Sequence, residues 1–556
     1  MATDHRTELV KRYNALPIQP LAPSGRVPNV WHFDLRYIPI SPPSHMLFLL
    51  QKESHFVATE ILPLGKKVFE SGLSYFPETA KQAALEICLG LMNSFITGFH
   101  GNSPTPDKLA PWKLTTDDRT LAKAVEEQFK SLGVNPDRCK VEYLNLTRFA
   151  HQQFDDVYKG MKGILGISDF VKAALTTPSA IDFSTAAPAD PNFFSPGSSF
   201  VGLSEDEENS DELKGANMIM AYYHEFMNNE PLPVNVNSSS RSSDQHASRL
   251  NQGFAQIKAL LETTTLKEVR KEADAGDAQQ AVDTALRLRF GYDCTPDRTL
   301  SRDYLIKAAF NATASSQTRS MAHSMLIPWY ILNRAEVRAR YLFAAAYHAD
   351  ESIRLASEGN PISSASPAAL IFYRNSFEPM TRDLKVPELL YHFKWISKAS
   401  QERQAFMKLQ KEAAERKMMG KPNRYRCANV GCGIEADRGK MLSQCSGKCD
   451  RDKKPSYCSR ACQKAPILPQ DWKTHKPFCQ PGAPCSVIDT SITTGGISQN
   501  GSIRVPVHHN DGTTSLLESS TLDPEMLKKM GEIMTEGRNI HDGSEGSTLR
   551  TELFET

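Results

Sequence analysis

The feature that most constrains this sequence is a cluster of seven cysteines and one histidine toward the C-terminal end. These residues fall into four pairs: Cys427/Cys432, Cys445/Cys449, Cys458/Cys462 and His475/Cys479. Eight nitrogen and sulfur ligands are what two tetrahedral Zn²⁺ ions require, and fully protein-ligated sites of this kind are structural rather than catalytic. We therefore expect the segment to bind two Zn²⁺ ions that hold a small fold together.

Disulfide bonding is the main alternative for such a cluster, and the sequence argues against it. Seven cysteines cannot pair completely, and His475 supplies an eighth ligand. The first ten residues are polar and lack the apolar core of a secretory signal. The most apolar run, residues 87–99, is too short to span a membrane. We expect an intracellular protein of the cytoplasm or nucleus, with no membrane partner.

The residues between the ligands resemble a MYND-type zinc finger over about residues 425–479. Tyr457 precedes Cys458, Gln463 follows Cys462, and Trp472 opens a W-x-x-H-x-x-x-C sequence that ends at Cys479. The resemblance implies two interleaved sites, one with Cys427, Cys432, Cys458 and Cys462, the other with Cys445, Cys449, His475 and Cys479. Two features depart from the family pattern: the first pair is spaced C-x4-C, and residues 465–470 are an insertion.

The same resemblance implies a function in peptide recognition. MYND fingers bind short proline-containing peptides alongside an exposed strand, and Gln463 and Trp472 are the matching peptide-binding positions. Trp472 could instead belong to the small core of the finger, and the 465–470 insertion could block the peptide groove. We expect a protein-interaction adaptor that reads such peptides on a helical scaffold.

Nucleic-acid binding is the second hypothesis. Residues 421–480 hold 13 Lys and Arg against 5 Asp and Glu, which leaves about +5 after seven thiolates and two Zn²⁺ are counted. However, the sequence contains no evident recognition helix and no series of stacking aromatic residues. It also contains no catalytic motif: residues 433–440 have the wrong glycine spacing for a phosphate-binding loop, and Met441 replaces its Ser or Thr. We expect no enzyme activity.

The rest of the chain predicts a mainly α multidomain protein. Apolar and polar residues alternate from Trp31 to Ile40, which predicts a half-buried strand. The runs 46–50 and 56–62 could be strands or helix. Helices are expected near 77–99, 116–132 and 146–165. The domains expected are a disordered segment (1–29), a mostly helical N-terminal domain with some strand (30–175), a disordered linker with one possible short helix (176–248), a helical domain (250–385), a connecting helix (386–420), the finger (425–480), and a disordered tail with one short helix near 523–535 (483–556).

The helical domain resembles a Sel1-type repeat, a relative of the tetratricopeptide helix pair, over about residues 272–310. Asp277 and Ala278 begin a run with small residues on one face, Gly291 ends it, and Pro296 and Asp297 form a turn before a second helix. An ordinary alanine-rich helical bundle would produce the same pattern, so both interpretations remain open.

Overall fold

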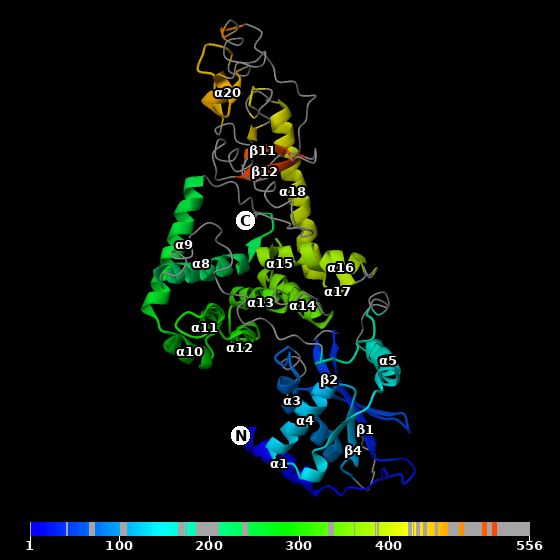
Figure 1. Cartoon of the computed structure of the whole chain (residues 1–556). Helices are drawn as coiled ribbons and strands as arrows, with labels where there is room; N and C mark the ends of the chain where they lie inside the picture. The colour runs from blue at the N-terminus through cyan, green and yellow to red at the C-terminus, as the bar shows by residue number, and fades with distance from the viewer. Residues whose placement is uncertain are drawn as a thin grey trace, which may run out of the picture. The chain divides into compact units, whose positions relative to one another are not determined.

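The computed structural model places the chain in two compact units, one formed by Met1–Val234 with Gln252–Ser400 and the other by Asn235–Asn251 with Gln401–Thr556 (Figure 1). The described residues are 2–39, 43–65, 73–99, 108–164, 172, 175–184, 211–235, 243–331, 339–360, 362–383, 385, 389–420, 425, 427–429, 434–436, 442–450, 454–464, 476, 479–482, 503–508 and 514–519. These residues are mainly helical with a small mixed sheet. None of the described helices has the length and apolar character that a membrane span requires.

The first unit contains a five-stranded sheet with the order β3-β2-β1-β4-β5. The strands β1, β2 and β3 form an antiparallel meander, and β4 and β5 add to it in parallel. Their bounds are β1 (Val30–Ile38), β2 (Ser44–Gln51), β3 (Phe56–Leu62), β4 (Lys113–Thr116) and β5 (Val141–Tyr143).

Helices cover both faces of this sheet, and β2 is accordingly buried along its whole length. Leu47 and Phe48 are consecutive in β2, so their side chains point to opposite faces. Leu47 lies against Gly90 of α3 (Ala80–Thr97), where an added Cβ would come within 2.9 Å of the leucine. Phe48 packs edge-on against Phe154 of α5 (Thr147–Ile164), with 5.2 Å between ring centroids.

The three helices expected in this region are present as α3, α4 (Arg119–Leu132) and α5, and α3 and α4 have side-chain N-caps and glycine C-caps. Asp118 accepts hydrogen bonds from Thr120 N and Leu121 N at the start of α4, and Gly133 ends it with a φ of 84°. The sheet is larger than expected. The sequence did not predict β4 and β5, because strands of four and three residues are too short to show an alternating pattern.

The expected disorder of residues 1–29 is wrong for the first helix. Residues 2–15 form α1 (Ala2–Ala15), which packs against α3 through the buried side chains Leu9, Val10 and Tyr13. The helix was missed because the prolines at 17–28 indicated a loose segment. These prolines lie after the apolar residues Leu9, Val10 and Tyr13, which form the buried side of the helix.

The expected linker 176–248 is also more ordered than predicted. Ile181 N donates to Leu35 O of β1, and Phe183 is buried. The possible short helix expected within this linker is α8 (Asp211–Asn229), and α9 (Ser243–Thr263) begins before the expected end of the linker. Strand β6 (Leu232–Pro233) pairs with β7 (Ser364–Ala365). Residues 185–210 and 236–242 lie outside the described part of the chain.

Consecutive antiparallel helices form the second layer of the first unit. Their bounds are α10 (Leu266–Asp274), α11 (Ala278–Phe290), α12 (Arg298–Ala309), α13 (Ser316–Ile331) and α14 (Ala339–Ala356), and each packs against the next. Asp277 and Asp297, which the sequence placed at the start of one helix and in the turn before the next, accept backbone N–H bonds as the N-caps of α11 and α12. Gly291 ends α11 with a φ of 74°, and a Cβ there would come within 2.8 Å of Pro296.

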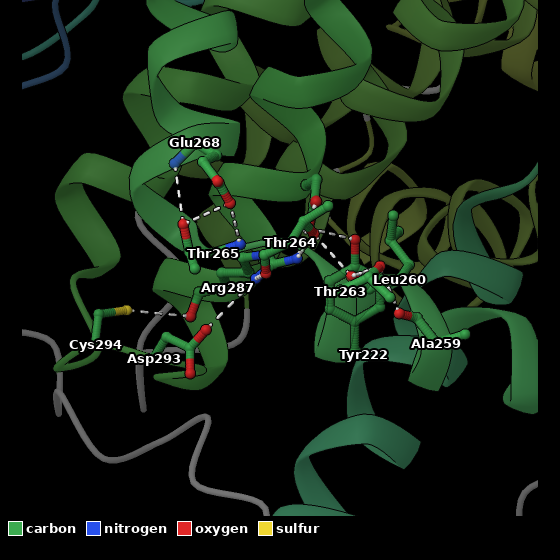
Figure 2. A network of polar contacts seen from close by, with 11 residues as sticks. Tyr222, Ala259, Leu260, Thr263, Thr264, Thr265, Glu268, Arg287, Asp293 and Cys294 are labelled. Carbon is green, nitrogen blue, oxygen red and sulfur yellow. Dashed lines mark hydrogen bonds and ion pairs between the residues drawn. The ribbon is translucent and has the colours of Figure 1, made fainter.

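A buried polar network joins these helices around Arg287, whose side chain is fully buried (Figure 2). Its guanidinium donates to Asp283 Oδ1 at 3.0 Å and to both the carbonyl oxygen and the hydroxyl of Thr264, at 2.8 and 2.7 Å. Tyr222 of α8 donates its hydroxyl proton to the same Asp283 oxygen at 2.9 Å. The network therefore fixes α8, the junction between α9 and α10, and α11 to one another.

The segment before α3 connects the sheet to the helical layer. Phe76 packs against Tyr330 and Tyr341, with ring centroids 5.0 and 4.9 Å apart. Glu78 forms an ion pair with Arg298, and Arg302 donates to the backbone oxygen of Leu73. Sheet and helices of the first unit are therefore one packed body.

Shorter helices follow, and then the long helix expected near 386–420. They are α15 (Pro367–Phe372), a single π-helical turn η4 (Tyr373–Phe377), α16 (Glu378–Asp383), α17 (Leu389–His392) and α18 (Lys394–Gly420). The long helix starts at Lys394 because Asp350 of α14 accepts hydrogen bonds from Trp395 N and Ile396 N, at 2.8 and 3.0 Å.

The second unit contains the cysteine-rich segment and part of the tail. Its short elements are β8 (Glu435–Ala436), β9 (Ser443–Gln444), β10 (Ser456–Tyr457) and α20 (Arg460–Lys464). The expected disorder of the tail is wrong for residues 503–508 and 514–519, where β11 (Ile503–His508) and β12 (Thr514–Ser519) form an antiparallel hairpin. The helix expected near 523–535 lies outside the described residues.

Candidate metal centre

The cysteine-rich segment is folded around short backbone pairings. Strands β9 and β10 are antiparallel, with Ser456 opposite Gln444. Cys427 forms a parallel bridge with Ser456, and Cys427 N donates to Ile434 O at 2.9 Å. These few bonds bring together cysteines that are far apart in the sequence.

The first triad consists of Cys427, Cys458 and Cys462, whose sulfur atoms all lie within 4.8 Å of one another. Cys458 lies two residues before α20 and Cys462 lies within it, and their sulfurs are 3.4 Å apart. Ser459 Oγ accepts a hydrogen bond from Cys462 N at 3.2 Å and so fixes the first turn of this helix.

The second triad consists of Cys445, Cys449 and Cys479, again with all sulfurs within 4.8 Å. The Cys479 sulfur is 3.5 Å from that of Cys445 and 3.8 Å from that of Cys449. Gly447 N donates to the Cys445 sulfur at 3.3 Å. A Cβ at Gly447 would lie only 1.8 Å from the Cys479 sulfur, so no other residue fits in this turn.

The donor set fits a structural zinc ion. Tetrahedral coordination with Zn–S bonds of about 2.3 Å separates the sulfurs by about 3.8 Å, close to the 3.4–3.8 Å found within the triads. The six cysteines are free thiols rather than disulfides. Without a metal, burial raises the pKa of the Cys445 thiol to about 12, so a thiolate at this position needs a cation beside it.

The triads divide the six cysteines in the interleaved manner that the MYND resemblance implies. The remaining two expected ligands, Cys432 and His475, lie outside the described residues, as does Trp472. Gln463 is half-buried in α20, one residue after Cys462. Gly447 was not predicted as a site residue, although its place inside C-x3-C is visible in the sequence.

The structure also pairs two histidines that the sequence did not connect. Nδ1 of His323 in α13 and Nδ1 of His348 in α14 are 2.8 Å apart, and both rings are buried. Within the described residues only the two cysteine triads group three or more metal-ligating side chains, so the histidine pair lacks a third ligand.

No family model matches the chain, and no match is found among the curated proteins or the solved structures. The assignment of this centre therefore rests on its own geometry.

Proposed function

We propose that this protein is a non-enzymatic interaction adaptor whose two-zinc, MYND-type finger reads short proline-containing peptides on a helical scaffold. The observation that carries the proposal is the pair of interleaved cysteine triads. If thiolates and an imidazole occupy all four coordination positions of a zinc ion, no position is left for a reacting water. This favours a structural role for the metals.

The structure supports a strand-addition mode of peptide binding. In the described sheet formed with β10, β9 is an outer strand, and both its residues are exposed. An extended peptide adds to such an edge through main-chain hydrogen bonds, and pockets for its side chains supply specificity. Gln463 in α20 is accessible enough to contribute an amide, and α20 packs against β10.

The helical layer suits the scaffold role. Helices α10 to α14 pack in sequential order, as in helix-pair repeats. We propose on this basis that the region is a Sel1-like or tetratricopeptide-like array that carries the finger.

The test is a titration of the zinc-loaded full-length chain with a pool of proline-rich peptides and, separately, with a mixed-sequence DNA duplex at low and moderate salt. We expect saturable peptide binding that is lost in Trp472→Ala and weakened in Gln463→Ala, with zinc content unchanged in both. Lys464→Ala, an exposed neighbour on α20, is the control and should bind normally. Duplex binding that falls steeply with salt and ignores Trp472 would support nucleic-acid binding through the basic charge instead.

A further inference from the structure

The tail hairpin pairs with the finger itself. Strand β11 lies antiparallel to β8, with Ile503 opposite Ala436 and Arg504 opposite Glu435, so that β12, β11 and β8 form one three-stranded sheet. The finger thus has two strand-accepting edges: β9, proposed above for peptides, and β8, which the chain's own tail occupies.

The position of β8 depends on the first metal triad. Ile434, directly before β8, is buried, and its carbonyl oxygen accepts the Cys427 backbone N–H at 2.9 Å. Cys427 belongs to the first triad with Cys458 and Cys462. A segment this small has too little apolar surface to hold that loop without the metal.

The hairpin in turn depends on β8. Strands β11 and β12 pair over six residues from Ile503/Ser519 to His508/Thr514. A two-stranded hairpin is at best marginally stable in water, and a third strand is what makes such a unit persist. Pro506 lies in β11, after the two residues that pair with β8. At this position the described neighbour of β11 is β12. Proline lacks the N–H that a central strand would need, so it limits the contact with β8 to a short stretch.

We propose that the hairpin of residues 503–508 and 514–519 docks on β8 through β11 only when the first triad holds zinc. Because residues 480–502 tether the hairpin to the finger, its effective concentration at β8 is on the order of millimolar, which favours docking within one chain over exchange between chains. The short contact makes the docked state reversible. Docking closes the β8 edge and leaves β9 as the edge open to a partner.

Hydrogen exchange with mass spectrometry on the full-length chain tests this, with and without a zinc chelator. We expect slow exchange in 503–508 and 514–519 with zinc, and at least a tenfold faster exchange after chelation, while α4 is unchanged. Equal protection of the hairpin with and without zinc, or no protection in either state, would overturn the proposal. Protection that rises with protein concentration would show that a second copy supplies the strand and would also overturn it.

A matched pair of variants separates docking from hairpin formation. Arg504→Pro alters a residue that pairs with both β8 and β12, whereas His508→Pro alters the far end of the same strand, whose described partner is Thr514 of β12. We expect faster exchange in residues 434–436 for Arg504→Pro but not for His508→Pro, with two zinc ions retained by both. Equal exchange in the two variants would contradict docking at β8. Peptide binding at β9 is measured separately, so either proposal can fail without the other.

Discussion

At the scale of single residues, Gly447 is as necessary to the second metal site as the cysteines around it. Its backbone N–H donates to the Cys445 sulfur, and the space where a Cβ would stand is filled by the Cys479 sulfur, 1.8 Å away. Gly447→Ala should therefore displace Cys479 and remove one of the two zinc ions. Inductively coupled plasma mass spectrometry should find about one zinc per chain.

Gly160→Ala is the control for this substitution. It lies in α5, and no atom stands within 4 Å of its added Cβ. This variant should keep two zinc ions. Two zinc ions in Gly447→Ala would show that the second triad is wrongly placed.

The buried histidine pair predicts an acid-sensitive first unit. With Nδ1 atoms 2.8 Å apart, one ring must donate and the other accept, so both cannot be protonated. Burial lowers the pKa of His323 to about 3 and that of His348 well below its usual value. The aromatic rings of Phe310, Tyr330 and Tyr347 surround the pair, and the nearby charged groups Arg319, Arg354 and Arg302 are all cationic.

Because the folded-state pKa values lie below the unfolded value of 6.5, the stabilisation is complete above pH 6.5. It is lost as the pH falls from 6.5 toward 3, by about 1.4 kcal/mol per pH unit for each histidine. Urea unfolding at several pH values should show a shallower slope over this window in His323→Phe than in the wild type. His224→Gln, at an exposed position of α8, should keep the wild-type slope. Parallel slopes in His323→Phe and wild type would contradict the buried neutral pair.

The residue scale also shows what the sequence can predict about the site. Eight ligands were predicted because closely spaced cysteine pairs, completed by a histidine, are characteristic of zinc sites. Six of these residues lie together in the two triads, and Cys432 and His475 lie outside the described residues. His323 and His348 were not connected, since a contact between neighbouring helices at 25 residues' separation leaves no spacing signal. Gln463 and Trp472 as peptide-binding residues stay predictions.

At the scale of elements, Arg287 joins α11 to the junction between α9 and α10. It is fully buried, pairs with Asp283, and binds both polar groups of Thr264 (Figure 2). Arg287→Met should lower the free energy of unfolding of the first unit by about 3–5 kcal/mol, because Asp283 would remain as a buried charge. The measurement is urea denaturation followed by far-ultraviolet circular dichroism.

A second substitution distinguishes a lost charge partner from a lost fold. Arg287→Met combined with Asp283→Leu should recover much of the stability, since no buried charge is left. Lys123→Met, in an exposed ion pair with Glu127, should change it by about 1 kcal/mol or less. A loss for Arg287→Met as small as that of Lys123→Met would contradict the role of the network.

The ends of helices were predicted correctly where a residue type strongly favours one backbone conformation or one position in a helix. Asp277 and Gly291 were predicted to begin and end the helix that is α11, and Asp297 to lie in the turn before α12. The structure confirms these places and shows in addition that both aspartates are N-caps. The short strands β4 and β5 were missed because their formation depends on pairing with β1, which is a tertiary contact. The hairpin at 503–519 was missed for the same reason, since β8 lies far away in the sequence.

At the scale of the whole molecule, the two units differ in what stabilises them. The first unit has an extensive apolar core that runs through sheet and helices, whereas the described part of the finger buries only a few apolar side chains, such as Ile434, Leu442 and Tyr457, beside its cysteines. Zinc chelation should therefore unfold residues 427–482 and leave the first unit folded. Limited proteolysis after chelation should cleave within the finger and spare a fragment that contains residues 2–164. Loss of that fragment at the same rate as the finger would show that the units do not fold independently.

The central claim, that the interleaved cysteine triads are two structural zinc sites, is tested most directly by the zinc content of the dialysed full-length protein. Inductively coupled plasma mass spectrometry should find two zinc ions per chain. It should find about one in Cys458→Ser, which affects the first triad, and about one in Cys449→Ser, which affects the second. A wild-type content well below two, or the loss of both ions in only one of these variants, would contradict two separate sites.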